Sequence, residues 1–465
     1  MQDTNVRIEL ALRYFKEGKF DLSILETNKV LELNPDDETA YLYRANAFFA
    51  KGLYGEAITD YKRAIELSPG DKSALYKLAT LYHDLNRQND AIPLYSKLIS
   101  LYPQIPLYYY NRGDAYKETG ELTEAFSDYS KATELDPMNF NAYNNRGLVN
   151  EALGRVDQAM RDYTTALTIK PDYYQAHYNR GKMYFELNQY DLALADLDLA
   201  LAIDSNRIKA LITRGDLHKA MGQPDLARKD YKRATEVDPL NADAYNALGN
   251  LFSDQNYQEA IDFYSKAIRL DQKAGIFYYN RGDVYSRLEQ YEKAIEDYTR
   301  AIELDPKDSD AYNNRGLAYH LIGKDHLAIK DFTSAIKANP EYPQAWSNRG
   351  HVSHGVGQLK RALYDLHQAV SITKNKLNAM SIRGEIYSDL GQYELALRDY
   401  EVILAIDEND NEALYQKAVL LDHMKRVQGA IAAYQQYLGK ANDTDAETRI
   451  HIISRMNELM QQTGD

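Results

Sequence analysis

Nine arginines in the sequence are each followed by an aspartate at one fixed spacing, that of Arg44 and Asp60. A planar guanidinium can bind a carboxylate through two parallel hydrogen bonds, and it can equally bind an acidic ligand. Two equivalent segments lack both partners, with Leu78 and Leu94 in one and Leu248 and Phe263 in the other. Because the arginine and the aspartate are present or absent together, we predict that each arginine is neutralised by its own aspartate. The predicted pairs are Arg44–Asp60, Arg112–Asp128, Arg146–Asp162, Arg180–Asp196, Arg214–Asp230, Arg281–Asp297, Arg315–Asp331, Arg349–Asp365 and Arg383–Asp399.

Six asparagines form two runs of three, and the members of each run are evenly spaced along the chain. An amide side chain both donates and accepts hydrogen bonds, so a row of amides can satisfy the backbone of an extended peptide. Neighbouring tyrosines would add contact area, and two aspartates would make each run locally acidic. The alternative is that these asparagines only hydrogen-bond a neighbouring helix. The candidate peptide-binding residues are Tyr110, Asn111, Asp114, Asn144, Asn145, Tyr178 and Asn179 in the first run, and Tyr279, Asn280, Asp283, Asn313, Asn314 and Asn348 in the second.

Other residue patterns in the sequence do not indicate an enzyme. It contains no phosphate-binding loop, no dinucleotide-binding glycine fingerprint, no HExxH motif, no nucleophile elbow and no cysteine. His320, His351 and His354 would converge on one surface, but no carboxylate or cysteine stands at a matching metal-ligand spacing. We therefore predict no catalytic residue, no metal site and no cofactor.

The elements that must position these residues are pairs of short helices. In the stretch from Ser309 to Tyr342, apolar residues recur at helical spacing in two segments, and Gly323 stands between them. Glycine adopts the left-handed conformation with which many helices end, and Pro340 stops the second helix. Gly316 and Ala328 are small, which predicts a close approach of the two helices. The same pattern returns directly before this stretch and directly after it.

This pattern resembles the tetratricopeptide repeat (TPR) family, whose repeat is about 34 residues long. Numbered from the first residue of each repeat, position 8 is Gly or Ala in all thirteen repeats, and position 20 is Ala in all but the first. The resemblance implies an all-α fold: an α-solenoid, a right-handed superhelix of about 13 TPR hairpins with a C-terminal capping helix. It also implies that the first helix of each repeat lines a concave face. The asparagine row resembles the asparagine ladder in the TPR region of O-linked N-acetylglucosamine transferase.

We expect residues 1–465 to form a single solenoid. The predicted divisions are repeats 1–3 at 4–105, repeats 4–7 at 106–241, a short repeat 8 at 242–274, repeats 9–12 at 275–410, repeat 13 at 411–444 and a capping helix at 445–462. YYNRGD occurs at Tyr109–Asp114 and again at Tyr278–Asp283, and AYNNRGL recurs at the same offset, at Ala142–Leu148 and Ala311–Leu317. Repeats 3–7 and 8–12 therefore look like two copies of one block, which would give two similar binding sites.

Composition limits the partners. The net charge of −14 argues against nucleic acid and anionic membranes, since both are polyanions. We find no apolar run of about 18 residues, which a spanning helix needs, and no secretory signal in the first residues. We therefore expect a cytoplasmic protein without membrane insertion. The predicted function is a non-catalytic scaffold that binds an extended peptide or partner protein on its concave face. The alternatives are a structural element that forms homo-oligomers through its convex face, and a substrate-recruiting subunit of a separate enzyme.

Overall fold

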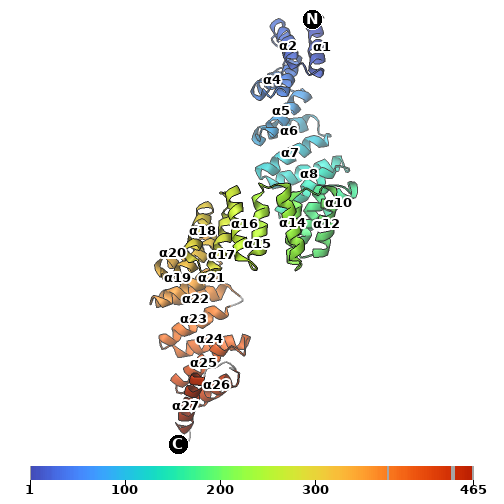
Figure 1. The fold of residues 1–465 in the computed structure, drawn as a ribbon. Coiled ribbons are helices and arrows are strands. Elements are labelled where there is room, and N and C mark those ends of the chain that lie inside the picture. Colours follow the sequence, from blue (N-terminus) through green and yellow to red (C-terminus); the bar gives the residue numbers. More distant parts are fainter. Residues whose placement is uncertain (1, 374–375, 441–445, 463–465) are drawn as a thin grey trace. The chain divides into compact units, whose positions relative to one another are not determined.

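The computed structural model describes residues 2–373, 376–440 and 446–462, which form 27 helices and no strand (Figure 1). The all-α prediction is therefore confirmed for this part of the chain. The helices are α1 (Gln2–Lys16), α2 (Phe20–Leu33), α3 (Glu38–Ala50), α4 (Tyr54–Leu67), α5 (Lys72–Asp84), α6 (Gln88–Leu101), α7 (Pro106–Thr119), α8 (Leu122–Leu135), α9 (Phe140–Ala152), α10 (Val156–Ile169), α11 (Tyr174–Glu186), α12 (Tyr190–Ile203), α13 (Ile208–Ala220), α14 (Pro224–Val237), α15 (Ala242–Phe252), α16 (Tyr257–Leu270), α17 (Gly275–Arg287), α18 (Tyr291–Leu304), α19 (Ser309–Leu321), α20 (Asp325–Ala338), α21 (Pro343–Gly355), α22 (Leu359–Ile372), α23 (Leu377–Asp389), α24 (Tyr393–Ile406), α25 (Asn411–His423), α26 (Val427–Lys440) and α27 (Ala446–Gln462).

The sequence determines the ends of these helices locally. Before α19, the side chain of Asp308 accepts a hydrogen bond from the backbone N–H of Ala311, which caps the helix N-terminus. After α19, Gly323 has a φ of +73°, the left-handed conformation that reverses the chain. Lys425 takes the same place in the last hairpin with a φ of +55°, although it is not a glycine. A left-handed residue of this kind follows the first helix in every hairpin except that of α15 and α16.

The two helices of a hairpin approach closely through small residues. A Cβ atom on Gly316 of α19 would lie 2.7 Å from Cε1 of Phe332 on α20, whose side chain is fully buried. Ala328 on the same helix is also fully buried. The large aromatic ring thus packs directly on the opposite backbone. A buried tyrosine or leucine takes this place in the other hairpins, except the first, where it is Thr27.

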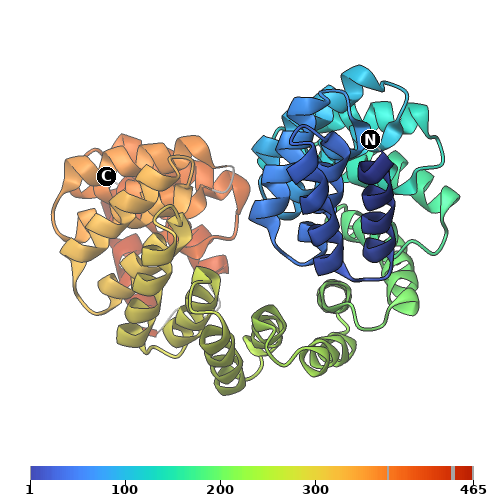
Figure 2. The ribbon, with the colours of Figure 1, turned by 90° about the horizontal axis from the view of Figure 1, so that it is seen from above.

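By contacts, the chain forms two compact units, Met1–Asp230 and Tyr231–Asp465. Within the first unit the first helices α7, α9, α11 and α13 contact one another in turn, and within the second unit α17, α19, α21 and α23 do so. Figure 2 shows the hairpins of the first unit, from blue to green, stacked in chain order. In each unit these four first helices therefore build one continuous face, which we call the first-helix face.

The remaining features of the fold are the short helix α15, the length and polarity of the helices, and the packing of α27. α15 has 11 residues where α13 and α17 have 13, at the place where the sequence lacks one residue of the repeat. None of the helices that the structure describes is long and apolar enough to cross a membrane. The apolar residues Ile452, Met456 and Leu459 of α27 are buried in a core cluster with α24, α25 and α26.

Candidate functional site

All nine predicted Arg–Asp pairs lie within hydrogen-bond distance. In each pair the Nε and Nη2 atoms of the arginine donate to the two carboxylate oxygens of its aspartate, at 2.6 to 3.0 Å. The aspartates are buried and the arginines are mostly half-buried. Because Nε and Nη2 already bind the aspartate, they are not available to bind an acidic ligand.

The third guanidinium nitrogen makes a contact that the sequence analysis missed. In eight of the nine cases Nη1 donates to an acceptor on the second helix of the preceding repeat, at position 25, at 2.6 to 3.4 Å. We call each arginine with its aspartate and this acceptor an arginine bridge. The acceptors are Asn28, Ser96, Ser130, Thr164, Asp198, Ser265, Thr299 and Thr333. The bridge therefore joins consecutive repeats as well as the two helices of one repeat.

The protonation of the bridge aspartates depends on their other neighbours. Burial raises the pKa of Asp128, although Arg112 opposes that shift. Burial also acts on Asp196, but hydrogen bonds from His177 and Arg180 outweigh it and lower the pKa of Asp196. His177 places Nδ1 2.8 Å from the Asp196 carboxylate. An additional donor thus keeps this carboxylate charged in spite of its burial.

The candidate asparagines lie on the first-helix face and bond the preceding repeat. The Nδ2 atom of Asn145 donates to the hydroxyl of Tyr110, and Nδ2 of Asn179 donates to Oδ1 of Asn144 at 2.9 Å. The same bonds recur in the second copy of the block, where Asn314 donates to Tyr279 and Asn348 to Asn313. Asn111 donates to Tyr76 and Asn280 to Asn246. Asn144 and Asn313 are buried, whereas the other candidate residues are half-buried.

These contacts correspond to the alternative in which the asparagines hydrogen-bond a neighbouring helix. They do not use every polar atom of the row. An amide nitrogen carries two N–H groups, and Asn179 and Asn348 each donate one hydrogen bond. Within the described residues their Oδ1 atoms accept none. Half-buried Asn179 and Asn348 therefore each keep one donor and one acceptor for a ligand.

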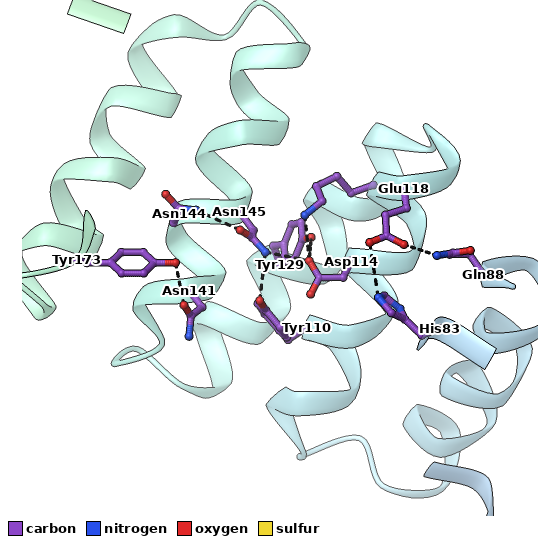
Figure 3. Close-up of polar contacts among 11 residues, drawn as sticks. His83, Gln88, Tyr110, Asp114, Glu118, Tyr129, Asn141, Asn144, Asn145 and Tyr173 are labelled. Carbon is purple, nitrogen blue, oxygen red and sulfur yellow. Dashed lines mark hydrogen bonds and ion pairs between the residues drawn. The ribbon is translucent and has the colours of Figure 1, made fainter. Parts of the chain in front are cut away.

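Asp114 is the centre of a hydrogen-bond network in the first unit (Figure 3). Its Oδ1 atom accepts from the hydroxyl of Tyr129 at 2.5 Å, from Nδ2 of Asn145 at 2.9 Å and from Nζ of Lys117 at 3.2 Å. Tyr129 belongs to α8 and Asn145 to α9, so the carboxylate joins the two helices of its own repeat to the next repeat. Three donors thus hold the carboxylate in place through one of its two oxygens.

Asp283 occupies the equivalent position in the second unit, but its contacts differ. Its Oδ2 atom lies 3.2 Å from Nε of Arg287, one turn along the same helix, and its side chain is 36% exposed against 18% for Asp114. The hydroxyl of Tyr298, the counterpart of Tyr129, is buried and has no hydrogen-bond partner in the described structure. The two copies are therefore chemically different, because Ser286 and Arg287 replace Lys117 and Glu118.

This difference predicts that replacing the tyrosine by phenylalanine destabilises the first copy but not the second. Tyr129→Phe should lower the free energy of unfolding by about 1.5–3 kcal/mol, since it removes a buried hydrogen bond to a carboxylate. Tyr298→Phe should leave it unchanged or raise it, because an unpartnered hydroxyl leaves the core. Phe332 already occupies this position in another repeat, so the ring itself fits. Hydrogen exchange of α8 and of α18 would measure both effects, and equal losses would contradict the assignment.

The three histidines lie on first helices α19 and α21. Nδ1 of His320 lies 2.6 Å from Asp325, and Nε2 of His354 lies 2.9 Å from Asp389. The rings of His320 and His351 meet edge to face at 5.8 Å. Among the described residues, no group of three or more His, Cys, Asp or Glu side chains is arranged to hold a metal ion.

Comparison with family models identifies the repeat. Models described as TPR repeat or tetratricopeptide repeat match segments that together span well over half of the chain. The matched residues are 45–85, 113–154, 152–186 and 282–323; 212–275 and 383–446; 174–207; 263–296; 73–104; and 309–342. The chain belongs to the tetratricopeptide repeat family. This TPR protein therefore has the repeat architecture of a protein-interaction scaffold.

The fold of this TPR protein was also compared with solved structures. The APC/C hetero-tetramer Cut9–Hcn1 gives a TM-score of 0.44 at 15% identity, over 97% of this chain and 95% of that chain. Yeast Tom70 gives 0.40 at 18% identity, over 92% and 96%. MamA gives 0.32 at 28% identity, over 34% of this chain and 92% of that chain. No curated protein matched the sequence.

Proposed function

We propose that this TPR protein is a non-catalytic scaffold that binds an extended segment of a partner protein on the first-helix face of each unit. The observation that supports this most is the regular row of half-buried amides, whose terminal members Asn179 and Asn348 keep a donor and an acceptor unused. An extended peptide presents backbone N–H and C=O groups that fit such atoms. Tyr110, Tyr178 and Tyr279 beside the row supply aromatic contact area at low entropic cost.

The two faces should not select the same segment. Asp114 accepts three hydrogen bonds on Oδ1 and is 18% exposed, whereas Asp283 has one arginine partner and is 36% exposed. A basic side chain of a bound peptide can therefore approach Asp283 more readily than Asp114. The duplicated block supports two binding sites in one chain, and a partner with two segments would gain avidity from them.

A peptide library tests the proposal. We expect Asn111→Ala/Asn145→Ala/Asn179→Ala to weaken the peptides bound by the first unit by about tenfold or more. The peptides bound by the second unit should be unaffected, and the reverse should hold for Asn280→Ala/Asn314→Ala/Asn348→Ala. Binding to the intact chain and to both variants would be measured by fluorescence anisotropy.

A matched control separates binding from loss of repeat packing, because the asparagines also bond neighbouring repeats. Ser96→Ala/Ser130→Ala/Thr164→Ala removes three hydrogen bonds between repeats in the same unit, but at the arginine bridges. We expect this control to keep its peptides. If it loses them to the same degree as the asparagine variant, the amide row is not the binding site.

Two alternative functions stay predictions: a structural element that forms homo-oligomers, and a substrate-recruiting subunit of a separate enzyme. Light scattering of the purified chain distinguishes them, since a stable homo-oligomer would favour self-assembly through the other face. A monomer that captures partner segments would favour the scaffold. A substrate-recruiting subunit would also capture segments, but it would co-purify with an enzyme.

A further inference from the structure

Two inner repeats, those of Leu78 and Leu248, lack both the arginine and the aspartate of the bridge. In each case the preceding repeat also carries a lysine in place of the usual acceptor. Position 25 of the preceding repeat carries Lys62 before Leu78 and Lys232 before Leu248, where the bridged joints carry an acceptor. An arginine facing either lysine would be repelled, so the lysine fits the loss of the arginine. The joint between α4 and the hairpin of α5 and α6 is therefore built differently from its neighbours in the first unit.

A cavity of about 400 Å³ lies at this joint. Its apolar lining comes from Ile65 on α4, Leu78 and Tyr82 on α5, and Pro93 and Leu94 on α6. Leu78 and Tyr82 are buried, Ile65 and Leu94 are half-buried, and Pro93 is exposed. The cavity thus has an apolar floor that opens to the surface, at the place where a bridge would otherwise cross.

The charges on the rim of this cavity leave a cation available. Asp90 pairs with Arg87, and Arg63 pairs with both Glu66 and Asp36, so each of these charges has a partner. The Lys62 ammonium is exposed and makes no ion pair or hydrogen bond in the described structure.

Helix α6, which forms one wall of the cavity, also offers a backbone carbonyl as an acceptor. Pro93 lies inside α6 and has no N–H, so the carbonyl of Asn89 lacks its usual helical donor. Asn89 lines the same cavity. An occupant could therefore donate a backbone N–H at the rim.

We propose that this cleft binds a partner segment with a large aliphatic side chain next to a carboxylate. The aliphatic side chain fills the space over Leu78 and Leu94, and the carboxylate pairs with Lys62. The volume of the cleft suits one such side chain with part of its backbone. This site is separate from the first-helix face, since it is lined by the second helices α4 and α6 with α5 beneath them.

The second of these joints shows how the chain can fill such a space by itself. There Phe263 takes the place of Leu94, and its ring stacks on Phe252, the counterpart of Tyr82, at 5.6 Å between centroids. Leu94→Phe therefore copies an arrangement that the protein already contains. A second variant, Lys62→Ser/Leu78→Arg/Leu94→Asp, would build the arginine bridge of the other repeats across the cleft.

The probes are labelled peptides that differ only at their centre: Ser-Gly-Glu-Leu-Glu-Gly-Ser, the same peptide with Lys in place of both Glu, and the same peptide with Ser in place of Leu. Fluorescence anisotropy with the full chain should show that the first peptide binds at least about tenfold tighter than the other two. Leu94→Phe and the bridge-building variant should each lose about tenfold or more of this affinity without a lower melting temperature. Lys62→Glu should invert the preference between the acidic and the basic peptide.

Several results would overturn the proposal. One is equal binding of the three peptides, and another is unchanged affinity in Leu94→Phe. Loss of the acidic peptide in Asn111→Ala/Asn145→Ala/Asn179→Ala would place it on the first-helix face instead. Sedimentation that shows a dimer of the wild-type chain, dissociated by Leu94→Phe, would assign the cleft to a second copy. Because the asparagine variant is expected to keep this peptide, failure of the cleft does not imply failure of the proposed function.

Discussion

Replacing Arg349 alone by leucine is expected to lower the free energy of unfolding of the second unit by about 3–5 kcal/mol. Its partner Asp365 is fully buried, and Arg349 is itself only 7% exposed. Nε and Nη2 of Arg349 donate to both carboxylate oxygens at 2.8 and 2.7 Å, and Nη1 donates to Thr333. Without the arginine, a charge would remain in the core with no donor to replace its hydration.

The double substitution Arg349→Leu/Asp365→Leu should recover most of this loss. Leu78 and Leu94 occupy the same two positions in another repeat, so the backbone accommodates two leucines. A buried ion pair contributes little net stability compared with an apolar pair, whereas an unpaired buried charge is costly. The prediction is therefore that the single variant is less stable than the double variant.

Hydrogen exchange of α21 and α22 in the full chain measures this effect locally, since a repeat array need not unfold as one unit. Arg300→Leu is the control, because its ion pair with Glu303 is exposed and solvent screens it, so its loss should leave stability nearly unchanged. Losses in the double variant as large as in the single variant would show that the carboxylate is not the reason for the arginine.

Phe332→Ala should cost about 3–5 kcal/mol, also in the second unit. The ring is fully buried and packs against the backbone of α19 at Gly316. Loss of the ring removes its contacts and leaves a cavity between the two helices of the hairpin.

Phe332→Leu is the matched control and should cost less than about 1.5 kcal/mol. Leu197 and Leu366 occupy this position in two other repeats and are fully buried there. Thermal and urea unfolding followed by circular dichroism, together with hydrogen exchange of α19 and α20, would measure both variants. A small effect of Phe332→Ala would mean that the hairpins are held together mainly by contacts between repeats.

The local elements could be predicted because their causes are local. A turn glycine such as Gly323 and a cap such as Asp308 act within a few residues, so the helix ends follow from the sequence. The Arg–Asp distance is also local to a hairpin, because positions 7 and 23 face each other whenever the two helices pair. Comparison of the repeats with one another was sufficient to place Arg112 beside Asp128.

The contacts between repeats required the tertiary structure. A signal for the arginine bridge was present, since position 25 carries acceptors before each bridging arginine and Lys62 or Lys232 before the two leucines. It is weak, because serine, threonine, asparagine and aspartate share only the ability to accept a hydrogen bond. The partner of an amide such as Asn145 could not be inferred either, since an amide can bond a ligand, a helix or water with equal chemistry.

By itself, the sequence of this TPR protein determined the repeat length, the helix pairs, the close packing at Gly316 and the charge pairing inside each hairpin. The tertiary structure decided how many donors of the asparagine row remain for a ligand, why Asp114 and Asp283 differ, and where the cavity at Leu78 and Leu94 opens. The physical reason is distance along the chain. Contacts within a hairpin are fixed by helical spacing, whereas contacts between hairpins depend on how side chains from different repeats share a limited number of hydrogen bonds and a limited volume.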